Sequence, residues 1–93
     1  MSHPHWLGVT VRLTTLDPPE TECSGCVAGE WYNQLCLRVA APLPIGATVQ
    51  IDGPGYLVLG EVYRRECAGA EYEAYVRVVH CIPDACQFKA SGA

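Results

Sequence analysis

The clearest pattern in the chain is a strict alternation of apolar and polar or small residues over residues 7–14. The apolar positions are Leu7, Val9, Val11 and Leu13. Side chains of a β-strand point alternately to its two faces, so this period of two is typical of a strand with one buried and one solvated face. We therefore expect a strand over residues 7–14.

Five further segments favour strands, most of them by the same alternation. A weaker, glycine-interrupted strand is expected over residues 20–27, and clearer ones over residues 34–39, 48–52, 56–65 and 71–80. Turn signals rich in proline and glycine separate them, including Asp52-Gly53-Pro54-Gly55, which predicts a hairpin with a loop longer than two residues. Six short strands at this spacing predict an all-β fold, a small six-stranded antiparallel barrel.

Helical periodicity is weak throughout the chain. No window of a dozen residues sustains a period of 3.6, although residues 83–89 could form one or two helical turns near the C-terminal end. With 93 residues, 49% of them hydrophobic and 17% charged, the chain is large enough for one core. We expect a single domain over residues 1–93.

Charge and hydropathy exclude some partners and compartments. A formal net charge of -4 lacks the positive field that attracts phosphate backbones, so we expect no nucleic-acid binding. No apolar run is long enough for a membrane-spanning helix, and the first residues do not read as a secretory signal. We therefore expect a cytoplasmic protein whose thiols are reduced.

One long stretch resembles the PilZ domain family. The likeness lies in residues 35–51, with the turn Leu43-Pro44-Ile45-Gly46, in residues 59–64, with Leu59-Gly60-Glu61-Val62, and in a last element from Tyr72 to Val76. The resemblance implies a six-stranded barrel of bacterial signalling that commonly senses cyclic di-GMP and relays it to a partner. It covers most of the chain.

The family's ligand-binding signatures are missing from this sequence. No arginine pair spaced RxxxR precedes residue 7, and Trp31, Asn33 and Cys36 stand where the D/N-x-S-x-x-G motif has its polar residues and glycine. Arginine pairs supply charge-assisted, often bidentate contacts to phosphates, which histidine and apolar residues do not replace. We therefore expect no tight binding of cyclic di-GMP.

Cysteines offer the main alternative chemistry. Cys23 and Cys26 have the two-residue gap of a metal knuckle or a strained disulfide, and Cys81 and Cys86 could complete four ligands. The competing interpretation is a set of ordinary half-buried thiols, which behave as small hydrophobes. A small metal-dependent or thiol-dependent barrel using Cys23 and Cys26 is thus the second hypothesis for function; we expect no bound metal or cofactor.

Catalytic constellations are not evident. Glu61, Glu71 and Glu73 fall at outward strand positions beside Arg65 and Arg77, where cross-strand ion pairs account for them. The sequence also lacks a glycine-rich phosphate loop and a serine elbow. We expect a protein without enzymatic activity.

Recognition through aromatic residues is the remaining hypothesis. Trp31 and Tyr32 follow Gly29-Glu30 at a loop that enters the strand over residues 34–39. Aromatic side chains on a rigid scaffold concentrate binding energy. The first hypothesis is therefore a noncatalytic, PilZ-like regulatory or protein-interaction module with a protein partner, whose contact residues are Trp31, Tyr32, Asn33 and Arg38.

Overall fold

The computed structural model describes residues 5–17 and 20–83. Every regular element in these ranges is a strand. The strands are β1 (Thr10–Thr15), β2 (Thr21–Trp31), β3 (Gln34–Val39), β4 (Thr48–Gly53), β5 (Tyr56–Ala68) and β6 (Glu71–Pro83).

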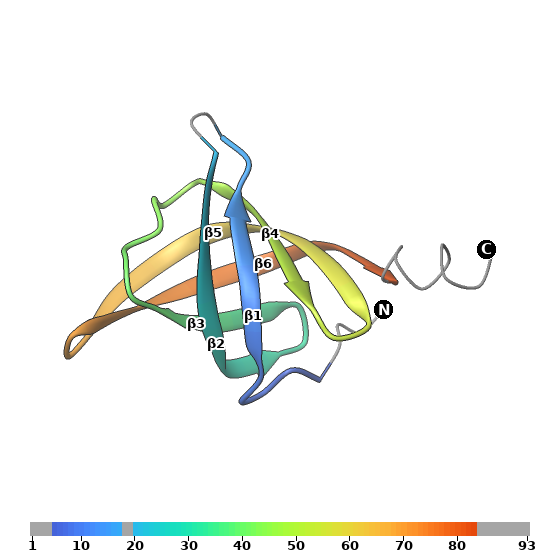
Figure 1. Cartoon of the computed structure of the whole chain (residues 1–93), viewed down its shortest axis with the longest axis horizontal. Coiled ribbons are helices and arrows are strands. Elements are labelled where there is room, and N and C mark those ends of the chain that lie inside the picture. Colours follow the sequence, from blue (N-terminus) through green and yellow to red (C-terminus); the bar gives the residue numbers. More distant parts are fainter. Residues whose placement is uncertain (1–4, 18–19, 84–93) are drawn as a thin grey trace.

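The strands form one closed barrel in the order β1-β2-β3-β6-β5-β4, with every neighbouring pair antiparallel (Figure 1). Pairing of β3 with β6 and of β1 with β4 completes the ring. The expected all-β, six-stranded antiparallel barrel is confirmed. The helical turns expected over residues 83–89 lie outside the described residues, apart from Pro83, which ends β6.

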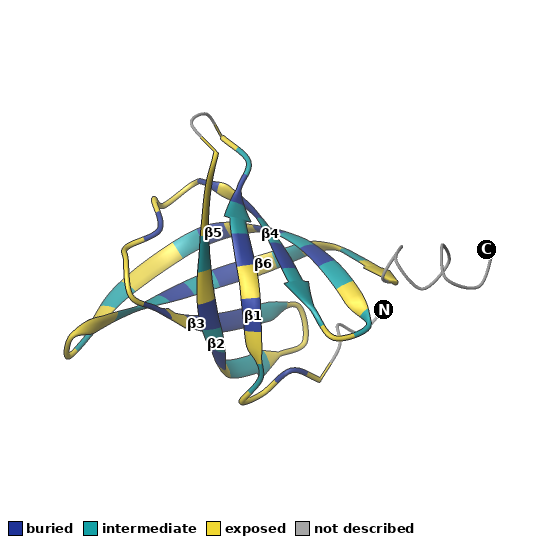
Figure 2. Ribbon diagram, viewed as in Figure 1, coloured by how far each residue is buried: buried dark blue, intermediate teal, exposed yellow. Residues whose placement is uncertain are grey.

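Alternation in the sequence corresponds to the inside and outside of the barrel (Figure 2). Leu37, for example, faces Val27 on one side and Ala74 on the other, and all three are buried. The buried apolar side chains make one cluster inside the ring. The described chain thus has a single hydrophobic core, formed by the inward residues of all six strands.

The first strand begins later than its alternation predicts. Leu7 is exposed, and Gly8 has a φ of 83°, a left-handed conformation that glycine adopts at little cost. The Val9 amide donates to the Trp6 carbonyl at 2.8 Å, which closes a turn. A turn at residues 6–9 therefore interrupts the alternating pattern, and β1 starts at Thr10.

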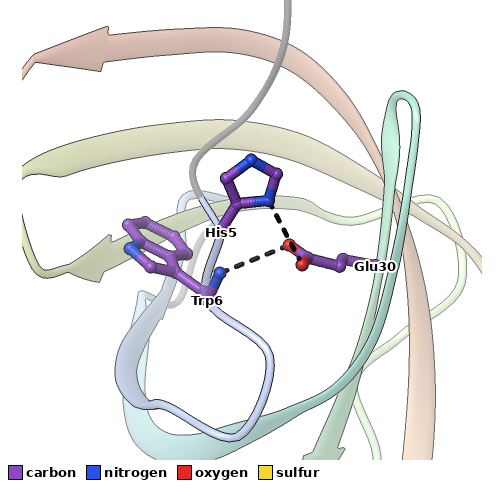
Figure 3. A network of polar contacts seen from close by, with 3 residues as sticks. All are labelled: His5, Trp6 and Glu30. Atoms are coloured by element: carbon purple, nitrogen blue, oxygen red, sulfur yellow. Dashed lines mark hydrogen bonds and ion pairs between the residues drawn. The ribbon is translucent and has the colours of Figure 1, made fainter.

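Trp6 packs at one end of the barrel. It is 2% exposed, and its Nε1–H donates to the Pro54 carbonyl at 3.0 Å. The Glu30 carboxylate accepts a hydrogen bond from the Trp6 amide at 3.3 Å and lies 3.4 Å from His5 Nδ1 (Figure 3). The segment before β1 is therefore part of the core, a role that sequence analysis did not assign to Trp6.

A bulge in β5 changes which side chains reach the outer surface. Val62 and Arg64 pair with consecutive residues of β6, so Tyr63 is an extra residue in β5. Such a bulge re-aims the side chains on either side of it. Arg64 consequently joins Tyr63 on the outer face, and Arg65 donates to the Leu43 carbonyl at 3.1 Å instead of pairing with a glutamate of the sheet as expected.

Candidate functional site

Trp31, Tyr32 and Asn33 lie together at the tip of the β2–β3 hairpin. Trp31 ends β2, Tyr32 and Asn33 form the turn, and Gln34 begins β3. Trp31 is 51% exposed and Tyr32 76% exposed, although both are large aromatic residues. The Asn33 carbonyl accepts a hydrogen bond from the Val78 amide at 2.7 Å, which ties the turn to β6. The hairpin therefore presents two aromatic rings on a backbone anchored to the barrel.

Trp31 folds back over the outer face of the sheet. Its indole stacks on Tyr75 of β6, with ring centroids 6.2 Å apart and an interplanar angle of 28°. Gly29 leaves room for it, since a Cβ at this position would lie 2.8 Å from the Trp31 Cη2 atom. One face of the indole is thus fixed by the protein, and half of the side chain stays accessible.

Two arginines and two tyrosines extend this surface across β3, β5 and β6. Tyr63 lies 6.4 Å from Tyr75 between ring centroids, and its hydroxyl donates to Gln34 Oε1 at 2.9 Å. The Arg64 guanidinium lies 5.0 Å from the Tyr75 ring, and that of Arg77 lies 5.4 Å from the Tyr63 ring. Guanidinium groups at these distances are attracted by the ring faces. We call Trp31, Tyr63, Arg64, Tyr75 and Arg77 the aromatic–arginine cluster.

Arg38 lies away from the hairpin tip. It is near the other end of β3, about 17 Å along the strand from Asn33 at the usual rise per residue. Its guanidinium forms an ion pair with Glu73 at 3.0 Å. Of the predicted contact residues, the structure therefore brings Trp31, Tyr32 and Asn33 together and places Arg38 apart, with its charge paired.

Cys36 lies beneath the cluster rather than at its surface. It pairs with Tyr75 across β3 and β6 and is buried. Burial raises the pKa of the Cys36 thiol, and the nearby Glu73 carboxylate raises it further. A neutral thiol is a poor nucleophile and metal ligand, so this cysteine contributes packing.

Cys23 and Cys26 do not converge on one point. They are three positions apart in β2, so their side chains leave opposite faces of the strand. Cys23 packs against the core, and burial raises its pKa, while Cys26 pairs with Arg38 and Thr10 on the outer side. Within residues 5–17 and 20–83, no group of three or more His, Cys, Asp or Glu side chains could hold a metal ion.

A hollow of about 470 Å³ lies at the end of the barrel away from the hairpin tip, between the β1–β2 connection and the segment before β4. Its polar groups already bond to the protein. The hydroxyls of Thr15 and Thr21 are 2.6 Å apart, and the Asp17 carboxylate accepts from the Thr48 amide at 3.1 Å. This hollow contains no nucleophile and base in contact among its described residues.

Most of the aromatic–arginine cluster was missed by sequence analysis. Tyr75 and Arg77 are two positions apart on a predicted strand, which indicates a shared face. The spacing of these two residues in the sequence was therefore enough to predict that they lie together. The place of Arg64 on this face could not be predicted, because it depends on the bulge at Tyr63, which the alternation of the sequence does not mark.

Comparison of the chain with protein-family models, with curated proteins and with solved structures finds no match. The part of the chain that the structure describes includes no helix long and apolar enough to cross a membrane.

Proposed function

We propose that this chain is a noncatalytic, PilZ-like regulatory or protein-interaction module whose contact surface is centred on the β2–β3 hairpin tip. The observation that carries the proposal is the exposure of Trp31 and Tyr32, at 51% and 76%, beside the aromatic–arginine cluster. Exposed aromatic residues on a rigid support are typical of binding hot spots. Regulation in a bacterial, cytoplasmic signalling setting belongs to the same proposal and comes from the family resemblance alone.

Two features support an interaction role over the alternative that uses cysteines. The thiols of Cys23 and Cys26 leave opposite faces of β2, so the pair cannot chelate one ion or form a bond within that strand. The aromatic rings, by contrast, are held at the surface by stacking and by the Gln34 hydrogen bond. An interaction surface therefore accounts for more of the observed geometry.

Site-specific photocrosslinking tests the proposal. A photoreactive phenylalanine analogue replaces Tyr32 in one version of the chain and Ile45 in a matched control, within the cells that produce the protein. Ile45 is 61% exposed and lies beside Thr21, at the opposite end of β2. We expect one discrete protein adduct from position 32 and none from position 45. Equal labelling at both positions, or none at position 32, would contradict the proposal.

Titration calorimetry with cyclic di-GMP tests the regulatory part. The guanidinium of Arg38 is paired with Glu73, and the RxxxR arginine pair of the PilZ family is missing from this sequence. We therefore expect no measurable heat when cyclic di-GMP is added to the reduced protein. Micromolar binding would refute this expectation. In that case Trp31→Ala and Arg38→Ala would show whether the hairpin or β3 holds the dinucleotide.

A further inference from the structure

The end of β6 extends beyond the strand that pairs with it on one side. β3 pairs with β6 only from Tyr72 to Arg77, and the last bond on that side runs from the Val78 amide to the Asn33 carbonyl at 2.7 Å. β5 pairs with the other edge of β6 as far as Pro83. Among the described residues, therefore, no strand pairs with the outer edge of β6 over residues 79–83.

We name residues 79–83 the open edge; in Figure 1 they are the end of the β6 arrow that runs past the β2–β3 hairpin. Val79 is 59% exposed, and Ile82 and His80 are also exposed. A bulge at Val79 and Pro83 protect the two ends of the segment, but between them it carries no Lys, Asp or Glu, the charged residues that also protect strand edges. Backbone amides and carbonyls that pair with no described strand, beside exposed apolar side chains, match one kind of partner, another extended strand.

We infer that the open edge of β6 is a docking site for an extended, apolar segment of a partner protein, which adds a strand beside β6 in line with β3. This inference rests on the proposed interaction function and specifies how the partner binds. An added strand that runs antiparallel to β6 has the same direction as β3. Antiparallel pairing is also slightly more stable per residue than parallel pairing. It ends at the hairpin tip, where Tyr32 contacts its last residues.

The length of the open edge favours a peptide over a second copy of the chain. A bulge at Val79 begins the edge, and Pro83, which lacks an amide hydrogen, ends it. Pairing is thereby limited to about 13 Å of strand. A symmetric dimer joined along so short a strand buries far less than the roughly 1,200–2,000 Å² of a stable interface. A peptide that also contacts Tyr32 needs no such area.

The test starts from selected peptides, because the partner sequence is unknown. Random linear peptides displayed on phage are selected against the full, reduced chain, and the recovered peptides are synthesised. Binding is then measured by fluorescence anisotropy for the wild type, Val79→Lys and the control Ile45→Lys. Both substituted residues are exposed, at 59% and 61%, and a circular dichroism spectrum checks that each variant keeps its fold.

We expect peptides with alternating apolar residues and no internal proline. Val79→Lys should weaken their binding roughly tenfold, equivalent to losing one or two cross-strand pairs, and Ile45→Lys should leave it unchanged. Amide hydrogen exchange of the wild type needs no variant and should slow at residues 79–82 when peptide is present.

Three results of the peptide experiments would overturn the inference, and a fourth comes from the oligomeric state. These are selection of no binding peptide, peptides whose affinity is the same for the wild type and Val79→Lys, and slowed exchange only outside the open edge. A wild-type dimer that Val79→Lys converts to a monomer would assign the edge to a second copy and also overturn it. The photocrosslink at position 32 is independent of these outcomes, so loss of the open-edge inference and loss of the proposed function are distinguishable.

Discussion

Removal of the Trp6 side chain is expected to destabilise the barrel strongly, although Trp6 precedes the first strand. The residue is 2% exposed and its indole donates a hydrogen bond to Pro54. Replacing a buried tryptophan by alanine lowers the free energy of unfolding by about 3–5 kcal/mol. At about 0.05–0.15 kcal/mol per residue, the 93 residues give a total of about 5–14 kcal/mol. Trp6→Ala should therefore remove about a fifth or more of the stability.

Urea unfolding followed by far-ultraviolet circular dichroism, with reductant present, measures this loss. With a slope of about 1–2 kcal/mol per molar urea, a loss of 4 kcal/mol moves the midpoint down by about 2–4 M. Trp6→Phe keeps most of the apolar surface and should lose only about 1–2 kcal/mol, chiefly the hydrogen bond.

Trp31→Ala is the matched control, because Trp31 is the chain's second tryptophan and is 51% exposed. It loses the stacking on Tyr75, worth about 0.5–1.5 kcal/mol, and part of its burial. Equal losses for Trp6→Ala and Trp31→Ala, or a loss below about 1.5 kcal/mol for Trp6→Ala, would show that Trp6 does not complete the core.

Three further predictions concern the sheet itself. Gly60→Ala should lower the free energy of unfolding by about 3 kcal/mol, because the new Cβ would lie 2.4 Å from Val76 Cγ1; wild-type stability in urea would contradict the observed register. Cys36 has a pKa raised by burial above its ordinary value of 9.0, so the folded state holds this proton more tightly than the unfolded state. The free energy of unfolding should fall as pH rises past that value. Urea titrations at several pH values should show a smaller fall with pH for Cys36→Ala than for the wild type; the same pH dependence for both proteins would refute this reasoning. Arg38 and Glu73 form an exposed ion pair, so a double-mutant cycle should give a coupling below about 1 kcal/mol that decreases with salt, and a coupling above about 2 kcal/mol would mean that the pair is effectively buried.

The strand pattern was predictable because the inner face of a closed barrel is buried and its outer face is exposed to solvent. Inward positions are apolar with few exceptions, such as the buried Thr15, so alternation such as that of residues 34–39 marks a strand directly, and β3 covers these same residues. Where alternation ends, turns rich in glycine and proline follow, and the predicted hairpin joins β4 to β5. Its loop is only Pro54-Gly55, shorter than expected, because Asp52 and Gly53 still pair with β5. Local sequence and tertiary burial agree here, which is why the fold class was correct.

Departures from alternation were not predictable. The bulge at Tyr63 inserts one residue without a local signal. It places Arg64 on the outer face beside Tyr75, while the side chain of Arg65, which pairs with Ala74 in the sheet, donates to the Leu43 carbonyl. Trp6 lies before the strand predicted over residues 7–14, and its role depends on contacts with Glu30 and Pro54, which are distant in the sequence. Such contacts join residues far apart in the chain, and no periodicity encodes them.

The candidate site was predictable in its contiguous part. Trp31, Tyr32 and Asn33 are neighbours in the chain and remain neighbours at the hairpin tip. Arg38 was predicted to belong to the same contact site, yet the extended backbone of β3 carries it about 17 Å from Asn33. Tyr75 reaches Trp31 only through the pairing of β3 with β6.

Closure of the ring has a consequence for synthesis of the chain. β6 is the last of the six described strands to leave the ribosome, yet it supplies the partner for both β3 and β5. Until residues 71–83 emerge, one edge of β3 and one edge of β5 stay unpaired, and the side chains of Val27, Leu37 and Val62 have no closed interior to enter. The ring therefore cannot close before residues 71–83 have been translated, and until then the nascent barrel is exposed to the aggregation hazard of open strands.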